Sequence, residues 1–284
     1  MTGPVLGPVL GPVVVGFDGS PESLAASAWA AREAQRRGSP LELLQAWPRP
    51  HREAADQYRS AERLTSREAE LRATVDVPVT STQVADAPAE ALEAAGRNAA
   101  LLVLGSRGLG AVRGFLVGSV SQEVLRRATC PVVLVRADGT EPDGPVLVGV
   151  DLAHPVDEVL AFAFDAAARR SAALRVVHVW SPRVGSEYMA FDAIGGLEDE
   201  LSAVERTRFT ELLDPWRTRH PDVDVTADLV RGSATVALVD AAASARLLVL
   251  GRRLRRHLLG THLGPVAHAA IHHTPCPLAL VPHP

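Results

Sequence analysis

The sequence contains no lysine, because all 29 of its basic residues are arginine. A Walker A loop and a Schiff-base enzyme each require a lysine, so both kinds of site are excluded. Long apolar runs are also missing, and no stretch approaches the ~18 residues that cross a bilayer. With a net charge of -4, the chain lacks the concentrated basic surface that nucleic acids require. We therefore expect neither a membrane span nor a nucleic-acid partner.

Cysteine is scarce, and the two that occur, Cys130 and Cys276, stand in similar contexts just before apolar runs. Equivalent positions of this kind indicate two buried thiols better than one disulfide, which fits a reducing cytoplasm. A secretory signal is not indicated, since the first residues carry no positively charged side chain and prolines interrupt their apolar pattern. We interpret residues 1–11, which repeat Gly-Pro-Val-Leu, as a flexible leader.

What the sequence does contain is an internal repeat. The segment Leu101–Gly105 recurs without change as Leu247–Gly251, at an offset of 146. Val14–Asp18 resembles Leu147–Asp151 at an offset of 133, so the second copy carries an insertion of 13 residues after Trp180. The matching segments keep their order, which predicts a duplicated domain. The predicted boundaries are 12–137 for the first domain, 138–145 for a linker and 146–284 for the second domain.

Each copy alternates short apolar runs with longer helical patterns. In the first copy the predicted strands are 12–17, 41–47, 78–84, 100–105 and 131–136. The predicted helices are 21–37, 52–74, 88–98 and 118–128. The strands are almost wholly apolar, as in sheets that helices cover on both faces. This pattern predicts an α/β fold of two tandem doubly wound domains, each with a five-stranded parallel sheet, in which ligands bind beyond the carboxyl ends of the strands.

A glycine-rich loop follows the fourth predicted strand. Gly105, Gly108 and Gly118 allow the backbone to approach a ligand closely, and Gly118 and Ser119 open a helix. The first N–H groups of a helix have no intrahelical partner, and together with the helix dipole they favour an anion such as phosphate. Ser119 and Ser121 add hydroxyl donors. The loop therefore predicts phosphate binding, although glycine-rich loops frequently serve only as turns.

Charged residues at the same sheet edge fit this interpretation. Arg107 or Arg113 supplies positive charge for phosphates. Asp18 ends the first strand, where a carboxylate suits sugar hydroxyls or an adenine amino group. Asp18 can instead cap its own turn, which is the role we expect for its counterpart Asp151. Ser119 has no histidine or acid placed to activate it, so we interpret it as a hydrogen-bond donor and not as a nucleophile.

These residues resemble the universal stress protein family in its tandem two-domain form. The family's nucleotide motif, G-x2-G-x9-G-(S/T), is matched without deviation, and the likeness covers the whole chain after the leader. The resemblance implies ATP as the ligand, with Mg²⁺ left open, and a strand order of 3-2-1-4-5. It also implies a cytoplasmic stress-response role and pairing of the two domains within the chain or in a homodimer. With Arg107 added from the loop, the predicted nucleotide-binding residues are Asp18, Ala46, Gly105, Arg107, Gly108, Gly118, Ser119, Val120 and Ser121.

The second copy departs from this motif. Leu254 replaces the middle glycine and Pro265 replaces the Ser/Thr, while Gly251 and Gly264 remain. A β-carbon at position 254 hinders the close approach that glycine permits, and Pro265 contributes neither an N–H group nor a hydroxyl. We expect the first copy to bind ATP and the second to bind it weakly or not at all.

Three functions remain open from the sequence. The first is an ATP-binding regulatory protein that acts on an unknown protein partner. The second is a slow ATPase or phosphoryl-transfer enzyme, although no clear acidic pair beside the loop marks a metal site for hydrolysis. The third is a nucleotide-free interaction scaffold. A metal site at His268 and His272, four residues apart on a predicted helix, is disfavoured because no cysteine or carboxylate nearby completes the ligands.

Overall fold

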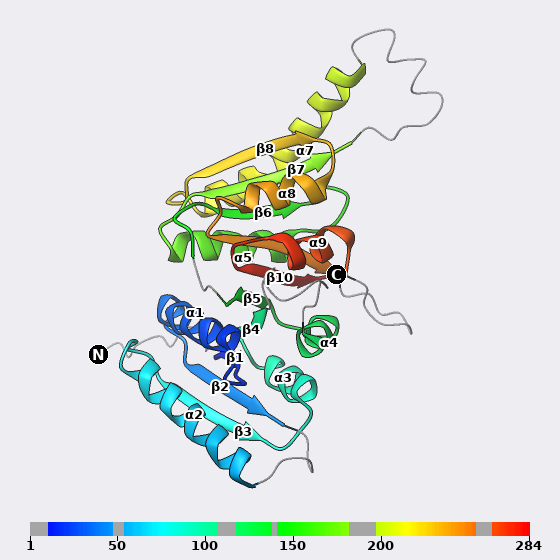
Figure 1. The fold of residues 1–284 in the computed structure, drawn as a ribbon. Helices are drawn as coiled ribbons and strands as arrows, with labels where there is room; N and C mark the ends of the chain where they lie inside the picture. Colours follow the sequence, from blue (N-terminus) through cyan, green and yellow to red (C-terminus); the bar gives the residue numbers. More distant parts are fainter. Residues whose placement is uncertain (1–10, 48–53, 107–117, 138–140, 182–196, 254–262) are drawn as a thin grey trace, which may run out of the picture. The chain divides into compact units, whose positions relative to one another are not determined.

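The structure is a computed structural model, which describes residues 11–47, 54–106, 118–137, 141–181, 197–253 and 263–284. The described residues form two compact units, and the chain passes from the first to the second between residues 137 and 141. Each unit contains five strands, with helices on both faces of its sheet (Figure 1). Among the described helices, none combines the length and the apolar character needed to cross a bilayer.

The first unit alternates strands with helices. Its elements are β1 (Val13–Gly16), α1 (Pro21–Arg37), β2 (Leu41–Ala46), α2 (Ala54–Arg72), β3 (Val79–Val84), α3 (Pro88–Gly96), β4 (Leu101–Ser106), α4 (Ser119–Arg127) and β5 (Val132–Arg136). The strand order is β3-β2-β1-β4-β5, and every neighbouring pair is parallel. Helices α1 and α2 lie on one face of the sheet, and α3 and α4 lie on the other (Figure 1).

The second unit repeats this architecture. Its elements are β6 (Val146–Val150), α5 (Asp157–Arg169), β7 (Leu174–Trp180), α7 (Leu197–Arg219), β8 (Val225–Arg231), α8 (Ala234–Ala242), β9 (Leu247–Arg253), α9 (Pro265–His273) and β10 (Leu278–His283). The strand order is β8-β7-β6-β9-β10, again with parallel neighbours. Counted within each unit, both orders are 3-2-1-4-5. The predicted fold class, two tandem doubly wound domains, is therefore confirmed.

The strands are apolar because the helices bury both of their faces. In β1, Val13, Val14 and Val15 are each 1% exposed or less, and the buried run 101–104 fills β4 in the same way. Fully burying an aliphatic side chain of this size contributes about 1.5–3 kcal/mol. The central strands are consequently held firmly, and the short segments that follow them start from fixed positions.

The turn from β1 into α1 is closed by local hydrogen bonds. Ser20 caps the helix, with its side chain accepting a hydrogen bond of 3.2 Å from the Ser23 N–H, and Pro21 begins the first turn. Gly19 has a φ of 79°, in the left-handed region that glycine tolerates without strain. These features fix the position of Asp18, which lies between the end of β1 and this cap.

The segment that joins the two repeats is held by the second unit where the structure describes it. The Arg246 guanidinium donates through Nε to the Gly144 carbonyl at 2.5 Å and pairs with Asp143. Arg170, whose side chain is wholly buried, contacts the Glu141 carboxylate at 3.4 Å. Residues 1–10 of the predicted leader, and 182–196 in the region of the predicted insertion, lie outside the described residues.

Candidate functional site

The carboxyl ends of β1 and β4 form a topological switch point, where the connections that leave two adjacent strands lie on opposite faces of the sheet. The two strands are parallel neighbours, yet α1 leaves β1 on one face of the sheet and α4 follows β4 on the other (Figure 1). In open α/β sheets, a crevice forms at such a position, and ligands bind there. The residues to inspect are therefore the turn after β1, the end of β4 and the start of α4.

A cavity of about 270 Å³, here called the edge cavity, lies at this point. Sixteen residues line it: Gly16, Phe17, Asp18, Ser20, Glu22, Ser23, Leu44, Ala46, Pro88, Leu92, Leu104, Gly105, Gly118, Ser119, Val120 and Ser121. Seven of the nine predicted nucleotide-binding residues are among them. The other two, Arg107 and Gly108, lie outside the described residues, as does Arg113. The structure therefore brings together every predicted site residue that it describes.

The start of α4 presents unpaired backbone donors to the edge cavity. Gly118 is the N-cap residue, and the helix begins its hydrogen bonding with the Gln122 N–H, which donates to the Gly118 carbonyl at 3.1 Å. The N–H groups of Ser119, Val120 and Ser121 precede that bond, so they have no acceptor within the helix. Together with the positive end of the helix dipole, they make this wall of the cavity attractive to an anion.

The two glycines that bound this region serve different purposes. A β-carbon on Gly105 would lie 2.7 Å from the backbone carbon of Glu22, so the packing of α1 against β4 itself requires a glycine there. Among the described residues, no atom would lie within 4 Å of a β-carbon on Gly118, and its φ of -54° suits any residue. Nothing in the described fold demands a glycine at position 118. Its lack of a side chain leaves room beside the N–H donors of α4.

Asp18 both caps its own turn and lines the edge cavity. The Ser20 N–H donates to its Oδ1 at 2.9 Å, which is the turn-capping role that the sequence left open. Burial alone would raise the pKa of Asp18, but hydrogen bonds from Ser20 and Ser23 outweigh burial and place the pKa below its ordinary value of 3.8. The carboxylate is therefore ionised at neutral pH, so both of its oxygens are hydrogen-bond acceptors.

Several residues of the cavity wall were not predicted from the sequence. Leu44, Leu92 and Leu104 provide an apolar surface from β2, α3 and β4, and Pro88 adds the start of α3. In the sequence these positions are indistinguishable from ordinary core residues, so no pattern marks them as part of a site. Glu22, in the first turn of α1, adds a second carboxylate. The edge cavity thus joins an apolar wall, two acidic side chains and a helix N-terminus.

The corresponding edge of the second unit differs in its chemistry. Both carboxylate oxygens of Asp151 have local partners: the Ala153 N–H donates to Oδ1 at 3.0 Å, and His154 Nδ1 lies 2.8 Å from Oδ2. Burial opposes ionisation of Asp151, but its contacts with Ala153 and His154 lower its pKa below 3.8. Pro265 begins α9 and has no N–H to offer. Leu254 lies outside the described residues.

The histidines near the C-terminus were considered as metal ligands. His268 and His272 do lie together on α9, with ring centroids 4.7 Å apart. Across the described part of the chain, no group of three or more His, Cys, Asp or Glu residues is placed to hold a metal ion. His257 and His262 fall outside that part.

The lowered pKa of Asp18 leads to a testable prediction. In a titration followed by the carboxyl ¹³C shift, wild-type Asp18 should have a pKa below 3.8, and Ser20→Ala should raise it because a hydrogen bond to the ionised form is lost. Ionised Asp18 then stabilises the fold above a pH of about 4, and this contribution disappears as the pH falls through the lowered folded-state pKa. The control is Ser233→Ala, which changes the N-cap of α8 in the other unit and should leave Asp18 unaffected. An Asp18 pKa at or above 3.8 in the wild type contradicts the assignment.

The fold agrees with what comparison with known proteins shows. The model of the universal stress protein family matches residues 10–136 and 144–282. Two universal stress proteins of Mycobacterium tuberculosis are 37% and 34% identical to this chain, over 92% and 89% of it and 93% and 90% of their own lengths. The crystal structure of a universal stress protein from Archaeoglobus fulgidus is 18% identical and has a TM-score of 0.70, covering 95% of this chain and 98% of its own.

Some solved universal stress proteins contain adenine nucleotides. One is a complex with cAMP and another, from Archaeoglobus fulgidus, is a complex with dAMP; they cover 45% and 44% of this chain, each at a TM-score of 0.37. Those ligands are properties of those proteins. Two tandem matches to one family model, together with relatives of the same length at more than 30% identity, identify the present chain: it belongs to the universal stress protein family.

Proposed function

We propose that the first unit binds ATP in the edge cavity and that the bound nucleotide sets the regulatory state of the protein. The observation that carries this proposal is the convergence of seven predicted residues, from four separate parts of the chain, on one cavity. A ligand large enough to touch Asp18, Ala46 and the start of α4 would explain why these residues meet at one cavity. An adenine nucleotide has the apolar base, the hydroxylated sugar and the anionic phosphates that such a wall suits.

Each part of the nucleotide has a matching part of the wall. The base lies against the apolar surface of Leu44, Leu92 and Leu104, beside Ala46. The ribose hydroxyls donate to the Asp18 carboxylate, which is ionised at neutral pH. The phosphates accept hydrogen bonds from the N–H groups that begin α4, with the hydroxyl of Ser119 as a further donor. No lysine is needed in this arrangement, because backbone donors provide the binding.

Charge balance supports a cation that accompanies the nucleotide. The described lining of the edge cavity holds two carboxylates, Asp18 and Glu22, and no arginine. Mg²⁺ commonly binds through one or two carboxylates together with substrate phosphates, so Glu22, which the ribose does not engage, fits ATP that carries Mg²⁺. Arg107, beyond the described residues, is the proposed source of positive charge from the loop.

The second unit is proposed to bind ATP weakly or not at all. Its turn engages both oxygens of Asp151, and Pro265 removes a donor from the start of α9. The duplicated chain then has one unit that binds the nucleotide and a second unit with the same fold that does not bind it tightly. A single responsive unit suits a regulatory protein whose signal is whether the nucleotide is bound.

Isothermal titration of the intact chain with ATP and Mg²⁺ tests this proposal directly. We expect one ATP per chain at the tighter site, because only the first unit keeps the full set of donors. Two equivalent tight sites would contradict the asymmetry between the units. Binding of no nucleotide would overturn the proposal in favour of an interaction scaffold, and ADP release well above a buffer control would instead indicate an ATPase.

Substitution of the two motif glycines separates binding from folding. Gly118→Ala should weaken ATP binding about tenfold or more, because its β-carbon enters the space beside the helix donors, while the free energy of unfolding changes by less than about 1 kcal/mol. Gly105→Ala should destabilise the fold by about 1–3 kcal/mol, because its β-carbon overlaps the Glu22 backbone. Urea denaturation and ATP titration measure the two effects.

The matched control is Gly264→Ala, the equivalent change in the second unit. A β-carbon there also has no described atom within 4 Å, so the fold should tolerate it, and ATP binding should stay at the wild-type level. If Gly264→Ala weakens ATP binding as much as Gly118→Ala does, the nucleotide is not held by the first unit alone. If Gly118→Ala binds ATP like the wild type, the phosphates do not lie at the start of α4.

A further inference from the structure

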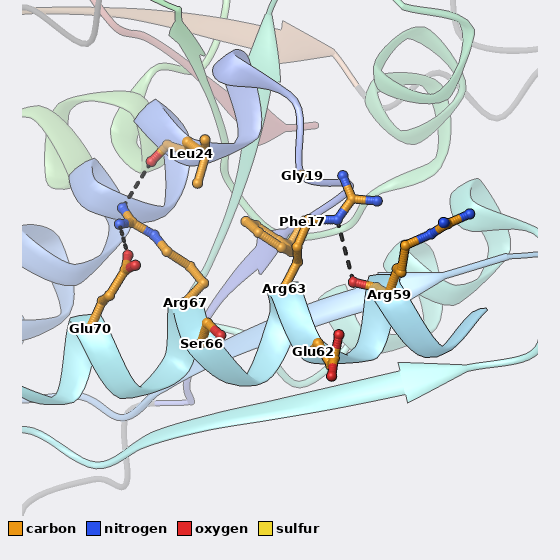
Figure 2. Close-up of a pocket in the computed structure, with 9 residues that line it drawn as sticks. All are labelled: Phe17, Gly19, Leu24, Arg59, Glu62, Arg63, Ser66, Arg67 and Glu70. Atoms are coloured by element: carbon orange, nitrogen blue, oxygen red, sulfur yellow. Dashed lines mark hydrogen bonds and ion pairs between the residues drawn. The ribbon is translucent and has the colours of Figure 1, made fainter. Parts of the chain in front are cut away.

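A second cavity of about 550 Å³, here called the helix cavity, lies between α1 and α2. Figure 2 shows its nine lining residues: Phe17, Gly19, Leu24, Arg59, Glu62, Arg63, Ser66, Arg67 and Glu70. Phe17 is the one residue that this lining shares with the lining of the edge cavity. The volume is in the range of small-molecule sites, roughly 300–1,000 Å³. The helix cavity is therefore large enough for a ligand of its own.

One end of the helix cavity is closed by a structural arginine. The Arg67 guanidinium donates to the Ser27 hydroxyl at 2.9 Å. It also donates to Glu70 at 2.8 Å and to the Leu24 carbonyl at 3.1 Å (Figure 2). These bonds tie α2 to α1 and neutralise Glu70. Because all three nitrogens of its guanidinium already donate hydrogen bonds, Arg67 holds the two helices together and has few N–H donors left for a ligand.

Arg63, one helical turn away, makes fewer hydrogen bonds with the described residues than Arg67 does. Its side chain extends from α2 toward the β1–α1 turn, and Nη1 lies 3.4 Å from the place where a β-carbon on Gly19 would be (Figure 2). Its hydrogen bond within the described residues uses Nε, which donates to the Arg59 carbonyl at 3.4 Å. The two Nη groups, which carry most of the N–H donors of a guanidinium, are left for another acceptor.

The surroundings of Arg63 define the chemistry of that acceptor. Phe17 and Leu24 give an apolar surface beside the guanidinium, and Leu24 is 40% exposed although it is a large apolar residue. Glu62, the remaining acidic residue in the lining, points away from the Arg63 guanidinium (Figure 2). A guanidinium binds a carboxylate through two parallel hydrogen bonds, and an apolar surface next to it favours an apolar group on the same molecule.

We propose that the helix cavity is a second ligand site, which takes a small organic carboxylate with an aryl or branched alkyl body. The Nη groups of Arg63 hold the carboxylate, and Phe17 and Leu24 contact the apolar body. Gly19, whose φ of 79° favours glycine, shapes the turn beside which the guanidinium lies. The site shares only Phe17 with the described lining of the proposed nucleotide site.

Fluorine NMR titration of the full-length chain with 4-fluorobenzoate tests this proposal. We expect binding in the millimolar range, as is usual for a ligand of about ten heavy atoms. The neutral amide of the same shape, 4-fluorobenzamide, should bind about tenfold more weakly, because it lacks the charge that Arg63 recognises. Equal binding of acid and amide, or no binding of the acid at about 20 mM, would overturn the proposal.

Substitution of Arg63 locates the binding. Arg63→Gln should weaken 4-fluorobenzoate binding about tenfold, and because the residue is exposed the fold should not depend on it. The matched control is Arg97→Gln, which removes one exposed positive charge beyond α3 and should leave binding unchanged. If the acid binds equally to the Arg63→Gln variant, or is lost equally in Arg97→Gln, it does not occupy the helix cavity.

The same titration separates this site from the proposed nucleotide site. Gly118→Ala alters the edge cavity but no residue of the helix cavity, so it should bind 4-fluorobenzoate like the wild type. Loss of the acid in Gly118→Ala would show that it binds at the edge cavity, which overturns the proposal. Failure of ATP binding, in contrast, leaves the expected fluorine result unchanged.

Discussion

The N–H groups at the start of α4 are the feature on which the candidate site depends. Backbone N–H groups at a helix N-terminus can hold phosphates without any charged side chain, so the absence of lysine from the sequence does not weaken the proposal. The parallel pairing of β1 with β4 brings the Asp18 turn and the end of β4 to one edge of the sheet. The Ser121 hydroxyl, 3.4 Å from the Gly105 carbonyl, links the first turn of α4 to the end of β4.

The two copies show how a fold can persist after its site has changed. The apolar strands β4 and β9 share the run Leu-Leu-Val-Leu-Gly, and burial of such runs supports the same sheet in both units. The site depends on far fewer positions. Pro265 in place of Ser119 keeps a good first turn of the helix yet removes a donor, because proline suits that position without supplying an N–H. If the first unit alone binds ATP, as proposed, architecture and ligand binding are separable in this family member.

Much of the fold could be predicted from the sequence, because apolar runs and helical patterns report burial directly. The site was only partly predictable. Asp18 was marked by its place after the first strand and Ala46 by the family resemblance, but Pro88 and Leu92 enter the cavity wall only because α3, to which they belong, packs against the sheet. Gly105 and Gly118 look equivalent in the motif. The structure distinguishes them, because the backbone of Glu22 packs against Gly105 and not against Gly118. Arg63 and Gly19 are 44 positions apart in the sequence, and the packing of α2 brings them close together. No local sequence pattern predicts that contact.

Backbone amide NMR spectra recorded with ATP and with adenosine test the central claim most directly. The N–H groups of Ser119, Val120 and Ser121 should shift on addition of ATP and stay in place with adenosine, because only the phosphates reach them. The amides beside Asp18 and Ala46 should respond to both compounds, because base and ribose are common to them. ATP that binds without moving the amides of residues 119–121, or that moves them no more than adenosine does, would contradict the account.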